Sequence, residues 1–259
     1  MVNIQIVDMT AVIAFWVTFT RWLAVMFQLP IFDNVSVPTL VKVLCTLIIS
    51  YAFYPYVSGD VMKDVQYLGE HAFWMLTIFN VVIGLAVGFL VKSIMNIFVS
   101  TGTIITQQVG FSMVRYFDPS TNQQVGPFEK LIQWTVLIMV ISSGALLPMF
   151  KGVMGTFHSI HFYQLGQFAQ APEFFIELFK SIFLAALMLA SPLIFTNVLI
   201  MSILGIIARI VPQMNVLMVS FVVNIGLGLL VFAATSNEFF QVAYNVYVEK
   251  LGEWFQFVT

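Results

Sequence analysis

Five long runs without a charged residue limit how this chain can fold. They cover residues 72–91, 93–114, 131–150, 181–208 and 210–237. A helix needs about 20 mainly apolar residues to cross a hydrocarbon core of roughly 30 Å, and a backbone in lipid has to satisfy its own polar groups. Hydrophobic residues make up 60% of the 259 residues and charged residues 8%, whereas globular domains carry roughly 25% charged residues. The sequence therefore predicts an all-α, polytopic membrane protein.

Proline and polar residues mark the expected ends of the helices. Pro38 and Pro172 stand where helices are expected to begin, because proline is tolerated in a first helical turn. Pro192 predicts a bend, and the polar residues 58–70 predict a solvated loop. The predicted helices cover about 9–29, 38–56, 71–100, 129–150, 173–209 and 216–235, with an amphipathic helix from Glu238 onward.

One stretch, from Gly102 to Lys130, differs in composition from everything around it. It combines several glutamines, Arg115, the pair Asp118-Pro119 and a series of aromatic residues. This composition is typical neither of a membrane span nor of a solvated linker. A loop that is both polar and aromatic usually fills or closes a space, so we expect the function to lie here.

Arg21 lies inside the first predicted helix. An ionised side chain within a span costs about 2.5–3.5 kcal/mol on insertion scales unless it reaches the interface or finds a partner. Two interpretations follow from the sequence. Either the side chain extends to the interface, or it packs against protein and locks this helix to a neighbouring subunit.

The third predicted helix carries a face suited to close packing. Gly84 and Gly88 have the spacing Gly-x-x-x-Gly, which lets another backbone approach closely. Asn80 lies on the same face, and a buried amide needs a hydrogen-bond partner. The three residues predict a contact with protein rather than with lipid.

Composition and motifs exclude several classes of function. A net charge of −2 gives no basic surface for nucleic acid, and the single Cys45 allows no intramolecular disulfide. His158 and His161 have no acid or cysteine near them in the sequence, so no metal site is predicted. No catalytic or phosphate-binding motif occurs, which predicts a protein without catalytic, cofactor-binding or metal-binding residues.

A small-solute secondary transporter is the alternative function. Transporters usually carry ionisable groups in the middle of several spans or paired broken helices, and neither pattern is visible in the sequence. Asn197 and Asn224 could contribute to a polar site in such a bundle. A purely structural membrane scaffold is a third interpretation, while the overall profile favours a channel or assembly component.

The residues also resemble a known family, FliR of the flagellar type III export gate, with its virulence-secretion counterparts. The matching pieces, in the same order and spacing over almost the whole chain, are Arg21 with Pro30 and Val37-Pro38; Ile83-Gly84-x-x-x-Gly88-Phe89; Gly102 through Gln108-Val109-Gly110-Phe111-Ser112 to Asp118-Pro119; and Leu204-Gly205-Ile206-Ile207-Ala208-Arg209-x-x-Pro212-Gln213-x-Asn215-Val216. The chain departs from the family at Asn80 and Thr106, where an acidic residue is common.

The resemblance implies a non-enzymatic subunit of an export gate in the bacterial inner membrane, at the base of the flagellum. Such proteins assemble with FliP and FliQ, work with FlhA and FlhB, and pass unfolded flagellar proteins. Residues 1–170 would be a FliP-like part and residues 171–259 a FliQ-like helical hairpin. The apolar helices would then contact partner subunits as well as membrane lipid.

The resemblance further implies that the loop within 102–128 plugs the closed pore. Aromatic and methionine side chains can seal a narrow lumen by excluding water. The alternative is that these side chains only anchor the loop on the protein's own helices. The implied plug residues are Gly110, Phe111, Met113, Arg115, Tyr116, Phe117, Asp118 and Pro119, and those expected in helix packing or assembly are Arg21, Asn80, Gly84, Gly88, Arg209, Pro212, Gln213 and Asn215.

Overall fold

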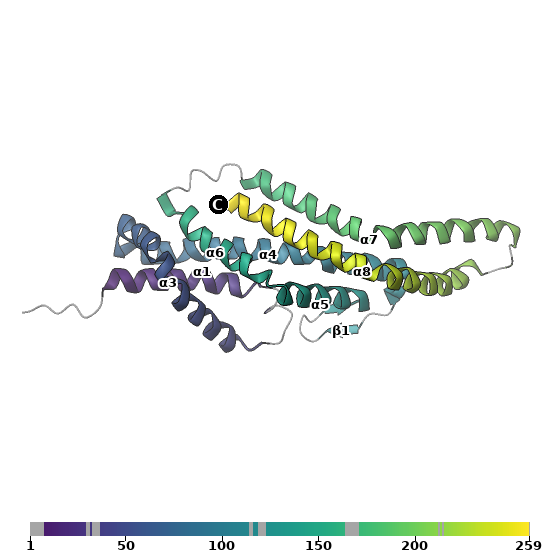
Figure 1. Ribbon diagram of the computed structural model, residues 1–259, viewed down its shortest axis with the longest axis horizontal. Helices are drawn as coiled ribbons and strands as arrows, with labels where there is room; N and C mark the ends of the chain where they lie inside the picture. The colour runs from purple at the N-terminus through teal and green to yellow at the C-terminus, as the bar shows by residue number, and fades with distance from the viewer. Residues whose placement is uncertain are drawn as a thin grey trace, which may run out of the picture. The chain divides into compact units, whose positions relative to one another are not determined.

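The computed structural model describes residues 8–29, 32, 37–113, 116–118, 123–163, 171–211, 213 and 215–258. Within them the regular secondary structure is helical apart from one two-stranded hairpin (Figure 1). Five helices are long and apolar enough to cross a membrane, or six if α5 and α6 count as one bent span. The prediction of an all-α polytopic membrane protein is confirmed. The helices are α1 (Met9–Met26), α3 (Thr39–Leu68), α4 (Phe73–Val109), α5 (Pro127–Ser142), α6 (Leu146–Ser159), α7 (Ala171–Ile210) and α8 (Val216–Val258).

The helices belong to two compact units, each drawn from separate stretches of the chain. The first unit comprises Met1–Ser93, Ala145–Phe174 and Lys250–Thr259. The second comprises Ile94–Gly144 and Phe175–Glu249. Both units therefore combine residues from before and after position 170, the boundary implied by the family resemblance.

The first unit is built on the packing of α1 along α3. The Trp22 ring is fully buried and stacks on Phe53 of α3 with 5.5 Å between ring centroids. Phe150 of α6 lies 5.8 Å from the same indole. Tyr54 of α3 adds a polar tie, since its hydroxyl donates to the carbonyl oxygen of Ala11 at 3.1 Å. Aromatic residues thus join three helices around one tryptophan.

The second unit is held together by close contacts at glycines. A Cβ atom at Gly102 of α4 would lie 2.5 Å from the Cα atom of Glu129 in α5. A Cβ atom at Gly228 of α8 would lie 2.9 Å from a methyl group of Val109. Since such distances leave no room for a side chain, α5 and α8 each approach α4 at a glycine.

The predicted loop over residues 58–70 is wrong. These residues continue α3 to Leu68, and Gly69, with φ of 78°, ends the helix. Asp60 and Lys63 form an ion pair at 2.7 Å one turn apart on the helix. Their charges indicate a polar helix face rather than a loop, because charged residues fit a helix as well as they fit a turn.

Three further helix boundaries differ from the prediction. The expected helix over about 71–100 continues as α4 to Val109, so residues 102–109 of the expected loop are helical. The expected helix over about 129–150 is two helices, α5 and α6. Gly144, with φ of 73°, takes the left-handed conformation between them. Conversely, the expected break before Glu238 is absent, and α8 is one helix of 43 residues. Thr235 and Ser236 donate hydrogen bonds to carbonyls of the preceding turn, so these hydroxyls are satisfied inside the helix.

Replacing Gly102 with alanine is expected to lower the free energy of unfolding by about 1–3 kcal/mol, the range for overpacking a tight contact. The added methyl would overlap the backbone of α5. The measurement is thermal unfolding of the full chain in detergent. Gly226→Ala is the matched control in the same unit, because nothing lies within 4 Å of its Cβ position. Equal midpoints for the two variants would contradict the close contact.

Candidate functional site

The end of α4 is fixed to two other helices of the second unit. Gln108 accepts a hydrogen bond from the side-chain amide of Asn197 in α7. One residue later, Val109 is fully buried against Gly228 of α8. The loop that follows Val109 therefore starts from a helix end that α7 and α8 hold in place.

Gly110 is the point where the chain leaves this helix. Its φ of 90° lies in the left-handed region that favours glycine, and its N–H donates to the carbonyl oxygen of Gln107 at 3.2 Å. A Cβ atom here would lie 3.7 Å from Ile225 and 3.8 Å from Phe221. The space therefore admits a side chain, whereas the backbone conformation disfavours one.

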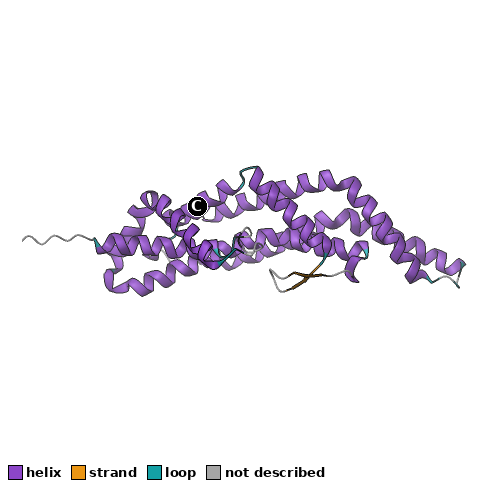
Figure 2. Cartoon of the chain, turned by 90° about the horizontal axis from the view of Figure 1, so that it is seen from below, coloured by secondary structure: helices purple, strands orange, loops and turns teal. Residues whose placement is uncertain are grey.

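A short 3₁₀ turn, Phe111–Met113, and a β-hairpin follow. Strand β1 (Tyr116–Asp118) pairs antiparallel with β2 (Gln123–Val125), and Tyr116 lies opposite Val125. Figure 2 shows the two strands in orange. Gly126 is the N-cap of α5, and a Cβ atom there would lie 2.7 Å from Thr106 of α4. The loop thus returns one helical turn from the place where it starts.

A row of phenylalanines ties the start of the loop to the helices of the same unit. The Phe111 ring lies 5.9 Å from the ring of Phe128 in α5. Phe128 is buried and packs edge-on against Phe232 of α8 at 5.0 Å, and Phe232 lies 5.8 Å from Phe239. The Phe111 side chain therefore has the geometry of an anchor on the protein's own helices.

Some of the other implied plug residues lie in the described part of the chain, and some lie outside it. Met113 ends the 3₁₀ turn, and Tyr116, Phe117 and Asp118 form β1. Arg115 and Pro119 lie outside the described residues. Of the implied plug residues, Tyr116, Phe117 and Asp118 therefore lie in the hairpin between Gly110 and Gly126.

Arg21 is buried in the first unit, with 2% of its surface exposed. Its Nε donates to Oδ1 of Asn80 in α4 at 2.8 Å, and its Nη1 donates to the carbonyl oxygen of Thr156 in α6 at 2.8 Å. The guanidinium carbon lies 4.0 Å from the centre of the Phe157 ring, a cation–π geometry. Both interpretations from the sequence differ from this arrangement, because the guanidinium joins helices of its own unit.

The two glycines beside Asn80 face α1, as a contact with protein requires. A Cβ atom at Gly84 would lie 2.5 Å from the carbonyl oxygen of Arg21. At Gly88 it would lie 2.9 Å from Gln28, whose side-chain amide donates to the carbonyl oxygen of Leu85 at 2.8 Å. The Gly-x-x-x-Gly face therefore seats α1 on α4 within one chain.

The residues expected at the turn between α7 and α8 are exposed. Arg209 lies in the last turn of α7, and Gln213 lies between the two helices. The Asn215 side chain accepts a hydrogen bond from the backbone N–H of Met218 at 3.3 Å and so satisfies one free donor of α8. Pro212 lies outside the described residues.

A polar cluster that the sequence reasoning missed lies where α3 meets the end of α6. Asp60 lies 3.4 Å from His158, and Asp64 lies 3.4 Å from His161. The expectation that no acid stands near the histidines is wrong in space, because α3 extends far enough to carry both aspartates. Among the described residues no group of three or more His, Cys, Asp or Glu is placed to hold a metal ion. The sequence signal that could have indicated this cluster is the spacing of Asp60 and Asp64, which are one helical turn apart.

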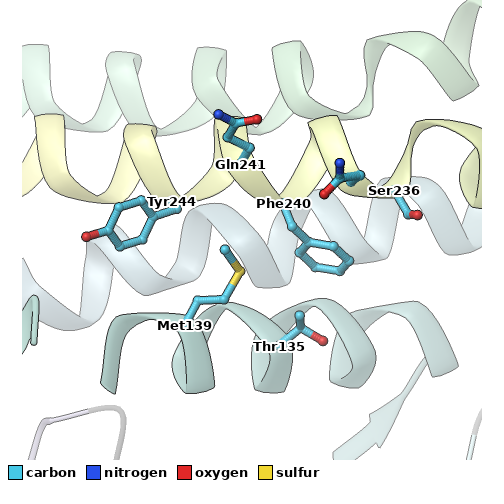
Figure 3. Close-up of a pocket in the computed structure, with 7 residues that line it drawn as sticks. Thr135, Met139, Ser236, Phe240, Gln241 and Tyr244 are labelled. Atoms are coloured by element: carbon cyan, nitrogen blue, oxygen red, sulfur yellow. The ribbon is translucent and has the colours of Figure 1, made fainter. Parts of the chain in front are cut away.

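A groove of about 580 Å³ lies between α5 and α8 in the second unit (Figure 3). Its described lining is uncharged, so it offers no acid–base pair for catalysis. The lining residues are Thr135, Met139, Ser236, Asn237, Phe240, Gln241 and Tyr244.

Known proteins are similar in sequence to this chain over most of its length. The family described as "Bacterial export proteins, family 1" matches residues 12–249. The "Flagellar biosynthetic protein FliR" of Escherichia coli strain K12 is 27% identical, covering 85% of this chain and 82% of that protein. The protein of the same description from Bacillus subtilis strain 168 is 24% identical, covering 90% of each. The "Yop proteins translocation protein T" of Yersinia pestis is 27% identical, covering 66% of each.

Removing the acceptor of Arg21 is expected to destabilise the first unit. Asn80→Ala leaves the buried Nε–H without its partner, which lowers the free energy of unfolding by about 1–3 kcal/mol. Asn80→Asp keeps an acceptor and makes the hydrogen bond charge-assisted, so this variant retains at least the wild-type stability. Chemical unfolding in detergent measures both. The control is Gln241→Ala at an exposed position, and the Arg21 contact is refuted if Asn80→Ala behaves like that control.

Proposed function

Because this chain belongs to family 1 of the bacterial export proteins, we propose that it is a non-enzymatic subunit of the flagellar type III protein export gate. The match over residues 12–249 carries this proposal. That the chain is a component of type III export is supported by relatives from both flagellar and Yop systems. The flagellar relatives from Escherichia coli and Bacillus subtilis match over 82% and 90% of their length and the Yop protein over 66%, which favours flagellar use.

The proposed setting is the bacterial inner membrane at the base of the flagellum. The candidate spans supply the apolar surface that lipid and neighbouring subunits require. In this proposal the chain assembles with homologues of FliP and FliQ, works with homologues of FlhA and FlhB, and passes unfolded export substrates. Residues 1–170 act as a FliP-like part, and α7 with α8 forms a FliQ-like hairpin within residues 171–259.

In the closed gate, the loop between Gly110 and Gly126 obstructs the pore. Three features support this role: α4 ends in a fixed position, a left-handed glycine redirects the chain, and the hairpin returns it to α5. Both ends of the loop are therefore held on helices of the second unit. Gly110 is the hinge in this scheme.

The residues of the loop have three proposed roles. Phe111 anchors the loop, since its ring packs near Phe128. Met113, Tyr116 and Phe117 are the sealing residues, because apolar side chains in a narrow lumen exclude water and ions. Arg115 and Asp118 are lumen or rim charges of the obstruction, and Pro119 completes the proposed plug segment.

Assembly is tested by co-expressing the full chain with FliP and FliQ homologues and measuring the mass of the purified complex. A single complex that contains all three proteins is the expected result. A stable monomer that binds a small solute would contradict the proposal and favour a transporter.

Deleting residues 111–117 is expected to increase the ion permeability of the membrane severalfold, because the gate loses its obstruction. Ion leak in cells that express the three-protein gate is the measurement. If the side chains seal the pore, a triple variant leaks as much as the deletion; its substitutions are Met113→Ser, Tyr116→Ser and Phe117→Ser. If Phe111 only anchors the loop, Phe111→Ser leaks less than the deletion. All three variants must co-purify with the partners, and unchanged permeability of the deletion variant in an intact complex rejects the plug.

A further inference from the structure

Asp64 and His161 form a buried pair in a chain that has few ionisable groups. Oδ2 of Asp64 lies 3.4 Å from Nδ1 of His161, and the two side chains are 7% and 6% exposed. Asp64 stands on the last turns of α3, and His161 stands just after α6. The proposed export function uses neither residue.

The second ring nitrogen of His161 fixes where the ring carries its hydrogen. Nε2 lies 2.9 Å from the carbonyl oxygen of His158. A carbonyl oxygen only accepts, so Nε2 has to donate. In a neutral imidazole the other nitrogen, Nδ1, is then an acceptor and would face a carboxylate oxygen, which also only accepts. The contact becomes favourable when a proton lies between the two groups.

Burial opposes a negative charge on Asp64, and three neighbours of the pair interact favourably with a charged ring or a charged carboxylate. The Tyr163 ring stacks on His161 with 5.1 Å between centroids and 8° between planes, which suits a cation over an aromatic face. On the other side, the charge of Arg21 in α1 and the backbone N–H of Phe162 both act on the Asp64 carboxylate. An imidazolium–carboxylate pair makes the contacts of Nδ1, Nε2 and the Tyr163 ring favourable, while Oδ1 of Asp64 has no hydrogen-bond partner among the described residues.

The other titratable groups at this place are more exposed and pair among themselves. On α3, Asp60 binds Lys63 at 2.7 Å and also faces His158 of α6 at 3.4 Å. The His158 side chain is 53% exposed. Tyr67 of α3 stacks near Tyr163 at 5.8 Å. Asp60 and His158 therefore form an outer pair of the same chemistry on the same two elements.

We propose that Asp64 and His161 are a proton-binding site that ties the end of α3 to the segment after α6. While the proton is bound, the pair is attractive and buried. When the proton leaves, two acceptors face each other in a poorly polar environment, and the tie loosens. The folded chain holds a proton that the unfolded chain gives up more readily, so stability falls as pH rises.

The state of the ring can be measured without any substitution. The chain has three histidines, so nitrogen NMR of the full chain, labelled at histidine and held in detergent, resolves each ring. The expected result is one ring with both nitrogens protonated at a pH where the other two are neutral. The signal of the His161 ring is identified because it disappears in the His161→Gln variant. A neutral His161 protonated only on Nε2 under these conditions refutes the proposal.

Asp64→Asn replaces the proton by an amide hydrogen, which can donate to a neutral Nδ1. In this variant His161 becomes neutral, and the fall in thermal midpoint between roughly pH 6 and pH 9 shrinks by about 2–4 °C relative to wild type. Asp60→Asn, in the outer pair, is the matched control and keeps the wild-type slope. The same slope in all three proteins overturns the proposal, as does a loss of slope in Asp60→Asn alone.

Discussion

A guanidinium buried in an apolar bundle has to be satisfied by protein, because neither water nor lipid can do so. In this chain Arg21 meets that requirement with an amide oxygen from α4, a backbone carbonyl from α6 and an aromatic face. The desolvation of such a charge is expensive, and it is offset only where all the partners stand in place together. The positions of α1, α4 and α6 in the first unit are thereby linked through one side chain.

The packing of the same helices also depends on glycines, which carry no side chain at the contact surfaces. Gly84 and Gly88 let α1 approach α4, and this approach brings Arg21 within reach of Asn80. In the second unit, Gly102 and Gly228 bring α5 and α8 onto the end of α4. Tight backbone contacts and a few buried polar bonds therefore specify packing that hydrophobicity alone would leave undefined, because apolar helices attract lipid as well as one another.

The sequence predicted the membrane class and most of the long helices, because a charge-free run of sufficient length has few other structures available. It also predicted a protein contact for Asn80 and the glycines on the same face, whereas neither of its two interpretations placed Arg21 between helices of one unit. The partners of Arg21 could not be predicted from the sequence. Thr156 lies 135 residues away along the chain, and hydropathy carries no information on such contacts. The extension of α3 past residue 58 and the bend at Gly144 were missed for a related reason. Charged residues occur in loops and on helix faces alike, and one glycine in an apolar run does not tell whether the helix ends there.

The position of the two ends of the loop has a consequence for how this protein can vary. Gly110 leaves α4, and Gly126 returns to it beside Thr106, so the hairpin is an appendage on a completed helical scaffold. Doubling the length of such a closed segment costs only about 0.6 kcal/mol of closure entropy. The size and chemistry of the segment can therefore change through insertions and substitutions while the helices beneath it keep their packing. Selection can act on the hairpin and on the scaffold separately.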